Sequence, residues 1–273
     1  MIEGRVMLTI SNSREECFSR FGFSFDRGGA HLARSMMLDE LRLLLQHQSA
    51  PSASLEVYQR AILDENCLAK RSSRTRQITL RHLKSLYALN PTVSLFRAMR
   101  YFWLRDVDGQ PLIAFLVAYS RDSVLRSSAS LILQRSRGSS IVCANMEEYL
   151  EETEVGRFSK ETLKAASQRV LASWTRTGHL AGHVTKTRTQ AVATPGSVAL
   201  ALFMGYLTDA RGQNLFETEY AKLLDCSVDR AIELAESASR KGWIVCKRIG
   251  SVIEVLFPNL LTAQEQEWVR EQS

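Results

Sequence analysis

The chain has 273 residues, 45% hydrophobic and 23% charged, so it can bury one large core or two ordinary ones and is not typical of a disordered protein. Its net charge of +6 and pI of about 9.2 favour acidic partners, meaning nucleic acid or an anionic membrane surface. The longest apolar runs, 111–119 and 197–207, are far shorter than the roughly 20 residues of a membrane span, which excludes an integral membrane protein.

The cysteines and the N-terminus indicate a cytoplasmic protein. The five cysteines are odd in number, widely spaced and never arranged as C-x-x-C, which is typical of reduced thiols rather than of disulfides or a zinc site. The N-terminus lacks the basic-then-apolar pattern of a signal peptide. "IEGR" at 2–5 spells a clotting-protease recognition site of the kind added by cloning. Residues 1–15 are therefore predicted to be a disordered tail.

The first half of the chain has helical periodicity throughout. A short extended piece at 20–25 and Gly28-Gly29 precede the first helix, and Ser72 or Ser73 can cap the third. We expect an all-helical N-terminal domain over 16–140 that contains a helix-turn-helix. The helices are expected at 30–46, 55–69, from Ser72 or Ser73 to about Leu89, 92–105, 111–120 and 122–135.

The second half repeats one order of elements twice. An acidic helix, a helix at 160–176 and a Thr- and Val-rich segment with period-two alternation are closed by Pro195-Gly196. Helices at 197–208, 215–225 and 228–241 then precede a β-hairpin with its turn at Gly250-Ser251. This order predicts tandem winged helix-turn-helix modules at 141–196 and 197–260, with a C-terminal tail at 261–273. The predicted fold class is therefore mainly α, with small β-hairpin wings.

The segment between Glu65 and Asp106 carries positive charge without a carboxylate. Within the third helix Arg74, Gln77, Arg81 and Lys84 recur at i, i+3, i+7 and i+10, as one stripe beside an apolar stripe. Arg can read guanine, Gln can read adenine and Lys can hold phosphate, so this helix is predicted to bind a DNA major groove. The alternative is a solvated basic face, although such a face normally mixes both signs. The basic residues of the segment are Lys70, Arg71, Arg74, Arg76, Arg81, Lys84, Arg97, Arg100 and Arg105, and Lys70, Arg71 and Arg76 join the predicted DNA-binding set.

The helix at 160–176 and the hairpin after it give a second candidate DNA surface. Gln168, Arg169 and Arg176 lie opposite the apolar face of this helix, among small alanines that permit close approach to a groove. Lys186 and Arg188 alternate onto one face of the predicted wing, which can contact the backbone or the minor groove. The alternative is a helix that packs between domains.

The second predicted module differs in charge. Asp229, Glu233 and Glu236 fall on one face of the helix at 228–241, and a phosphate backbone would repel them. We therefore expect this face to pack internally or to bind a protein partner.

Enzymatic motifs are weak in this sequence. His179 and His183 have metal-pair spacing, but Gly178 and Gly182 place them at a helix end and a strand start, without a third ligand nearby. Gly28-Gly29 lacks the pattern of a phosphate loop and indicates an ordinary turn. No serine elbow, Cys–His signature or magnesium-binding carboxylate cluster is evident. We therefore expect no catalytic residues, no metal and no cofactor.

Three blocks of the sequence resemble a known family. "RFGFSFDRGGAHLARSMMLDELRLLL", "DENCLAKRSSRTRQITLRHLKSLY" and "FSKETLKAASQRVLASWTRTGHLAG" resemble the BrxA family of bacterial BREX (bacteriophage exclusion) defence systems, over about residues 20 to 258. The resemblance implies a small, largely helical, non-enzymatic protein that binds double-stranded DNA. It would assign DNA contacts to Arg74, Gln77, Arg81 and Lys84, and to Gln168, Arg169 and Arg176. This chain departs from the family in its length and in its clear second winged module.

These observations together predict a cytoplasmic component of a phage-defence system that binds double-stranded DNA mainly through phosphates. Other BREX proteins would be its partners, through the acidic face. Two alternatives stay open: an assembly adaptor whose basic face meets an acidic protein, and an RNA-binding or transcription-regulating factor.

Overall fold

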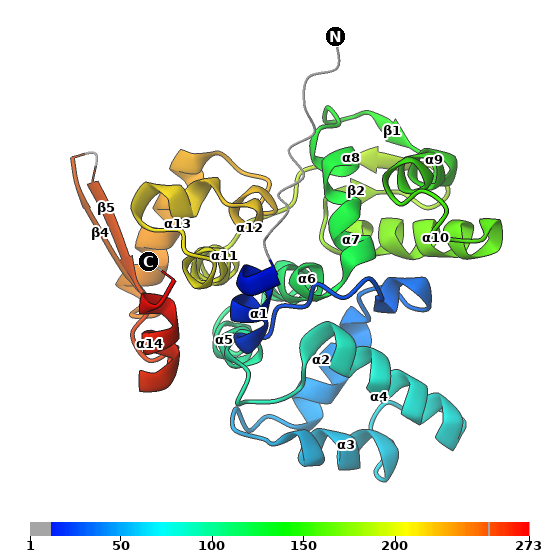
Figure 1. Ribbon diagram of the computed structural model, residues 1–273, viewed down its shortest axis with the longest axis horizontal. Coiled ribbons are helices and arrows are strands. Elements are labelled where there is room, and N and C mark those ends of the chain that lie inside the picture. Colours follow the sequence, from blue (N-terminus) through cyan, green and yellow to red (C-terminus); the bar gives the residue numbers. More distant parts are fainter. Residues whose placement is uncertain (1–11, 251, 273) are drawn as a thin grey trace.

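The protein is mainly helical, with two small antiparallel sheets (Figure 1). The computed structural model describes residues 12–250 and 252–272. The elements of the first half are α1 (Asn12–Arg20), the 3-10 helix η1 (Ala30–Leu32), α2 (Leu38–His47), α3 (Leu55–Leu63), α4 (Ser73–Tyr87), α5 (Ser94–Trp103), α6 (Gln110–Arg121), α7 (Ser123–Ser127) and α8 (Ala129–Leu133). Those of the second half are β1 (Ser140–Ile141), α9 (Cys143–Thr153), α10 (Lys160–Arg176), β2 (Leu180–Ala181), β3 (Lys186–Arg188), α11 (Pro195–Leu207), the 3-10 helix η2 (Gly212–Glu217), α12 (Glu219–Lys222), α13 (Val228–Arg240), β4 (Val245–Ile249), β5 (Val252–Leu256) and α14 (Ala263–Arg270).

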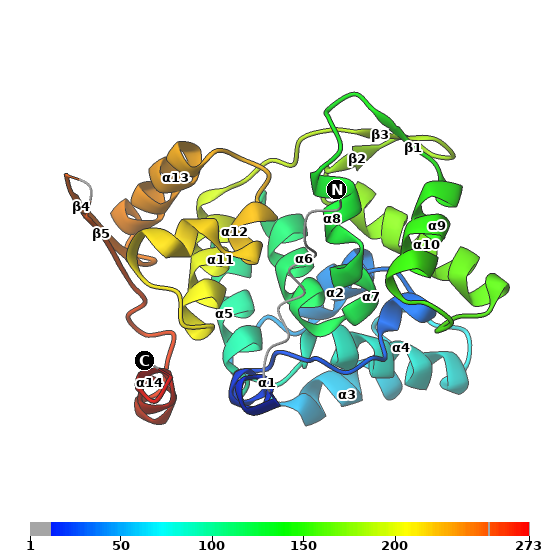
Figure 2. The ribbon, with the colours of Figure 1, turned by 45° about the horizontal axis from the view of Figure 1, so that its top comes forward.

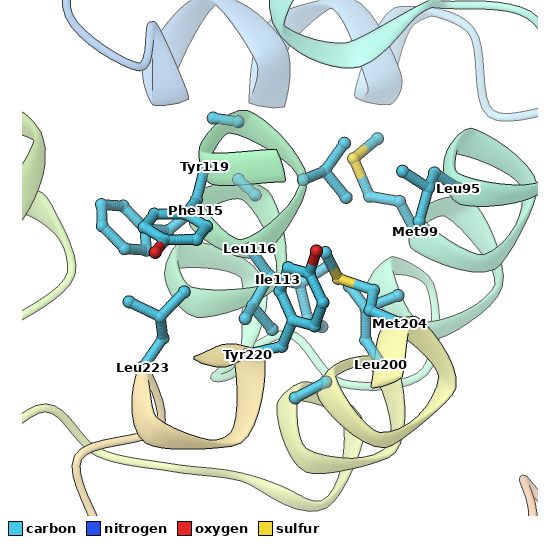
Figure 3. Packing of buried hydrophobic residues seen from close by; sticks show 14 of the residues in the cluster. Leu95, Met99, Ile113, Phe115, Leu116, Tyr119, Leu200, Met204, Tyr220 and Leu223 are labelled. Carbon is cyan, nitrogen blue, oxygen red and sulfur yellow. The ribbon is translucent and has the colours of Figure 1, made fainter. Parts of the chain in front are cut away.

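Helix α6 lies at the centre of the molecule and is buried over nearly its whole length. It packs against α4, α5 and α11, and Figure 3 shows Phe115 and Leu116 of α6 in the core shared with Met99 and Met204. A helix that is apolar on all sides needs protein on all sides, which explains the run at 111–119. Across the described ranges, none of the helices has both the length and the hydropathy that crossing a bilayer requires.

The starts of the three long polar helices were predicted correctly, because each begins at a serine cap. The Oγ of Ser72 accepts a hydrogen bond from the N–H of Thr75 at 3.1 Å. Ser159 and Ser227 cap α10 and α13 in the same way. The periodicity of the segments behind these caps therefore places α4, α10 and α13 where the sequence analysis expected helices.

The helix expected at 30–46 is wrong in its first half. Residues 33–37 are irregular, and Met37 has a φ of 52° immediately before α2. The N–H groups of His31 and Met36 bond to side chains of distant elements instead of to helical carbonyls. Tertiary hydrogen bonds here replace the local helix that the apolar periodicity suggested.

Three other predicted helices are shorter or divided. Helix α3 ends at Leu63 instead of 69, since Asn66 has a φ of 50° and its side chain bonds to both backbone groups of Lys70. The helix expected at 122–135 is divided at Ser128, and the one expected at 215–225 at Thr218. Each of these hydroxyls bonds to backbone nearby, which is how such residues compete with a continuing helix.

The sheets are small, and one contains an unexpected strand. The hairpin β4–β5 follows the prediction, with Ile249 paired to Val252; Ser251 of the predicted turn lies outside the described residues. In the other sheet β3 lies between β2 and β1, a strand that the sequence analysis did not predict. The hairpin formed by β2 and β3 is thereby attached, through β1, to the end of the first half of the chain.

Polar contacts join the β2–β3 hairpin and the residue before it to the turn between α12 and α13. Arg188 forms a two-pronged ion pair with Asp225, at 2.8 and 2.7 Å. The buried Nε2 of His179 donates to the carbonyl of Leu223 at 3.0 Å. Because these contacts are enclosed, they hold the two parts of the second half in one fixed arrangement.

The C-terminal segment folds back onto the start of the chain. Residues 261–273 were predicted to be a tail, but they contain α14, and the buried Glu265 accepts hydrogen bonds from Ser94 and Arg97 of α5. The ring of Trp268 packs edge-on against Phe21, with centroids 5.9 Å apart. Of the N-terminal tail predicted at 1–15, residues 1–11 lie outside the described residues, and Asn12 already begins α1.

We expect acid to destabilise the fold through His179. Burial lowers its pKa to about 4, against the opposing effect of Asp225. Between pH 6.5 and pH 4 the unfolded chain binds a proton that the folded chain does not, so the free energy of unfolding decreases by about 2.5 kcal/mol as the pH is lowered over this range. Urea unfolding across this range should show that loss in the wild type and a smaller loss in His179→Gln. The exposed His183→Gln should keep the wild-type dependence; an unchanged pH dependence in His179→Gln would contradict the assignment.

Candidate nucleic-acid interface

Helix α4 presents its polar stripe to solvent, as predicted. Arg74, Gln77 and Arg81 are exposed and Lys84 is half-buried. On the opposite side Leu83, Leu86 and Tyr87 are fully buried against the core. The helix is thus held by its apolar face and leaves cationic and amide groups free for a ligand.

Helix α10 has the same organisation. Gln168 and Arg176 are exposed, Arg169 is half-buried, and Val170 and Trp174 belong to the core. The indole N–H of Trp174 donates to Ser128 Oγ at 2.8 Å, and its ring packs edge-on against Phe115 of α6. This helix does pack between other elements, as the alternative interpretation proposed, but one of its faces stays open.

Residues 29–37, which we call the bridging segment, connect these two helices. In Figures 1 and 2 the part around η1 lies between α10 and α4. The N–H of Met36 donates to Ser173 Oγ of α10 at 2.9 Å, while its carbonyl accepts from the hydroxyl of Tyr87 of α4. The guanidinium of Arg169 donates to the carbonyl of Leu32. The two helices are therefore fixed relative to each other by a shared strip of backbone.

A buried polar cluster anchors the bridging segment. The carboxylate of Asp122 accepts from the N–H groups of His31 and Leu125, each at 3.0 Å, and lies 3.0 Å from His31 Nδ1. His31 Nε2 lies 2.8 Å from the Oγ of Ser173. Burial alone would raise the pKa of Asp122, but His31 and the backbone donors outweigh it and lower that pKa to about 2. The carboxylate is therefore ionised at neutral pH.

The same cluster has the composition of a hydrolytic triad, yet its hydrogen bonds hold the fold together. Ser173, His31 and Asp122 are all fully or almost fully buried. The hydroxyl of Ser173 donates to the carbonyl of Arg169 at 3.0 Å and accepts from Met36. A substrate cannot reach an oxygen that is enclosed and already hydrogen-bonded, so this cluster has no nucleophile available to a ligand.

Positive charges from three elements act on one imidazole at this surface. His82 of α4 is 8% exposed, and burial followed by the charges of Arg81, Arg34 and Arg169 lowers its pKa, while Asp122 opposes the shift. Burial and the charge of Arg34 also lower the pKa of Arg169. These arginines come from α4, the bridging segment and α10. The cations of the two helices therefore contribute to one positive region rather than to opposite sides of the molecule.

Arg188 is a correction to the predicted site. It is 3% exposed, and besides Asp225 it donates to the carbonyl of Ile132 at 3.0 Å, so it cannot contact DNA. Its neighbour Lys186 is half-buried and donates to the carbonyl of Gly182 at 2.7 Å. Burial lowers the pKa of Lys186. The β2–β3 hairpin therefore contributes much less positive surface than its sequence suggests.

Other predicted cations are neutralised by carboxylates from distant parts of the chain. Lys70 pairs with Glu40 at 3.1 Å, and Arg176 pairs with Asp39 at 2.6 Å, with both members of the second pair well exposed. Arg97 pairs with Glu265, and Arg100 is buried and donates to carbonyls of the loop before α3. Arg71 is exposed and Arg76 half-buried. The positive charge of the segment between Glu65 and Asp106, which contains no carboxylate, is thus partly neutralised once the chain folds.

The sequence analysis overlooked part of the open surface. Arg34 was placed within a continuous helix, and only the irregular bridging segment brings it close to His82 and Arg169. Lys160 and Lys164 are exposed and precede Gln168 at four-residue steps along α10. That spacing puts all three on one helix face, a signal that was present in the sequence.

His179 and His183, which have the spacing of a metal pair, lie in different environments. His179 is fully buried and bonded to Leu223, whereas His183 is exposed. Within residues 12–250 and 252–272, no group of His, Cys, Asp or Glu is arranged to hold a metal ion.

The acidic residues on α13 differ in their exposure to solvent. Asp229 and Glu233 are exposed and Glu236 is half-buried. Glu233 pairs with Arg230 at 2.8 Å on the surface of the same helix. Exposed carboxylates therefore do lie on this helix, as the sequence predicted.

Comparison with known proteins leaves the resemblance to the BrxA family as an expectation. No protein-family model matches the chain, and no curated protein matches it significantly.

We expect Gly29 to be essential for the anchoring cluster. A Cβ at this position would lie 2.7 Å from both carboxylate oxygens of Asp122, so Gly29→Ala must displace a carboxylate that is held by several hydrogen bonds. The expected loss of unfolding free energy is about 1–3 kcal/mol by urea denaturation. A Cβ at Gly28 meets no atom within 4 Å, so Gly28→Ala is the matched control and should change little. Equal stability of the two variants would show that the cluster is not tightly packed.

Proposed function

We propose that the protein binds double-stranded DNA through the surface formed by α4, the bridging segment and α10. The observation that carries the proposal is that the bridging segment, with its exposed Arg34, is hydrogen-bonded through Met36 both to Ser173 of α10 and to Tyr87 of α4, so that the cations of all three elements belong to one rigid unit. A rigid positive surface of this kind suits the regularly spaced phosphates of a duplex. Phosphate contacts would supply most of the affinity.

The exposed amides support an additional contact with base edges. Gln77 on α4 and Gln168 on α10 are exposed beside the cations on each helix. Glutamine can form paired hydrogen bonds with adenine in the major groove. The interface proposed here consists of Arg34, Arg71, Arg74, Gln77, Arg81, Lys84, Lys160, Lys164, Gln168 and Arg169, whereas Arg188 is left out.

We further propose that the chain acts within a BREX-type phage-defence system as a non-enzymatic, cytoplasmic component. The sequence resemblance to the BrxA family and the mainly helical architecture support this assignment. In the same proposal α10 with the β1–β3–β2 sheet, and α13 with the β4–β5 hairpin, act as winged modules. The exposed carboxylates Asp229 and Glu233 are suited to a basic protein partner.

The salt dependence of binding tests this surface. Replacing Arg74, Arg81 and Lys84 together with Ala should weaken duplex binding and reduce the slope of log K against log salt concentration by about 0.9 for each phosphate that the variant no longer neutralises. Fluorescence anisotropy with a labelled duplex at several salt concentrations measures both quantities. The matched control replaces Lys222, Arg240 and Arg270, which lie exposed on α12, α13 and α14, with Ala and removes the same charge. Equal slopes for the two triple variants would refute the assignment.

Competition distinguishes the remaining classes of partner. Unlabelled duplex DNA should displace the labelled duplex more strongly than duplex RNA does, because the narrow major groove of A-form RNA does not admit a helix. Stronger competition by RNA would favour the RNA-binding alternative. If the purified chain binds neither DNA nor RNA and its complexes with other proteins survive nuclease treatment, the hypothesis of an assembly adaptor is correct.

A further inference from the structure

The β4–β5 hairpin has an outer face that nothing in the described part of the chain covers. In Figures 1 and 2 this hairpin lies at the far left, and α10 and α4 lie on the right. The antiparallel register pairs Ile249 with Val252, Lys247 with Glu254, and Val245 with Leu256. Directly opposed residues point to the same side of a sheet, so these three pairs share one face. The other face is buried through Ile253 and Val255.

Large apolar side chains dominate this outer face. Ile249 is 82% exposed, Val252 69% and Leu256 44%. Single exposed apolar residues are common, but here three share one face of one short hairpin, with Ile249 and Val252 on one side of the Lys247–Glu254 pair and Leu256 on the other. The face continues at its base into a hollow of about 300 Å³, lined among others by Tyr206, Leu256 and Phe257. A face dominated by exposed large apolar side chains fits a protein surface better than it fits a nucleic acid.

The charged pair in the middle indicates which protein. Lys247 and Glu254 are both exposed, and within residues 12–250 and 252–272 neither forms a salt bridge. They lie side by side, with apolar pairs before and after them along the strands. A two-fold axis that runs parallel to the strands, between two such faces, would bring each lysine over the other copy's glutamate. The same operation stacks the Ile249–Val252 pairs on each other and the Val245–Leu256 pairs on each other.

We propose that the outer face of the β4–β5 hairpin is a homodimer interface, and that its occupant is the same face of a second copy of this chain. The pattern is self-complementary in charge and in hydrophobicity, as an isologous interface requires. Two five-residue strands provide less area than a standard interface, so the dimer is weak, with a Kd on the order of 10–100 μM. The dimer keeps the two α4–α10 surfaces at its outer ends.

Charge-swap complementation tests this geometry without DNA, and so stands or falls independently of the proposed function. Sedimentation velocity of the wild type, from about 1 to about 200 μM, should show a monomer–dimer equilibrium. Lys247→Glu and Glu254→Lys should each raise the dimer Kd about tenfold or more, because both intersubunit pairs become like-charged. An equimolar mixture of the two variants should restore a dimer with a Kd within about threefold of the wild-type value, since both pairs are then opposite in charge.

Matched controls carry the same charge changes elsewhere. Lys222→Glu on α12 and Glu152→Lys on α9 are exposed positions outside the hairpin and should dimerise like the wild type. A wild type that stays monomeric throughout, or swap variants whose mixture fails to recover the dimer, would overturn the proposal. If Ile249→Asp lowers the affinity for a DNA duplex without changing the sedimentation of the free protein, the hairpin tip contacts DNA and the proposal is equally wrong.

Discussion

The buried carboxylate of Asp122 is the contact on which the proposed interface depends. It holds His31, and with it the bridging segment, through hydrogen bonds in an environment where an unpaired charge would be costly. Through Met36 the same segment bonds to Ser173 of α10 and to Tyr87 of α4. Two helices that are far apart in the sequence therefore form one surface, because a strip of irregular backbone is attached to both.

The folded arrangement also decides which cations remain available. Arg188 is buried and paired with Asp225, Arg100 is buried and donates to the carbonyls of Gln48 and Ser49, and Lys70 pairs with Glu40, so these cations are not available to a ligand. Arg81 and Arg34 remain exposed, and burial followed by the charge of Arg34 lowers the pKa of Arg169, so like charges at this surface raise the free energy of the unbound protein. A polyanion would relieve that repulsion, which is why a positive cluster, more than the net charge of +6, points to a nucleic acid.

Local signals in the sequence were sufficient for some elements and not for others. Helical periodicity predicted the long helices, with a serine cap expected at Ser72 or Ser73, and the exposed stripe on α4 followed from its spacing. Long-range contacts could not be predicted from local patterns. Asp122 bonds to the backbone of His31 where a helix was expected, and β1 adds a strand to the first sheet. Asp225 pairs with Arg188 and removes it from the surface. Local sequence patterns report a side chain's periodicity and charge but not its distant partner. The spacing therefore predicted which side chains of α4 and α10 are exposed, but not that Arg188 is withdrawn by Asp225, and DNA binding by the exposed residues stays a prediction.

The central claim is that α4 and α10 face one duplex together, and photo-crosslinking from both helices tests it most directly. A benzophenone amino acid placed at Gln77 or at Gln168, both exposed, should crosslink to the same short labelled duplex. Unlabelled duplex should abolish both crosslinks at the same concentration. The same probe at the exposed Glu233 of α13 should give none. A crosslink from only one of the two helices, or equal crosslinking from Glu233, would contradict a shared surface.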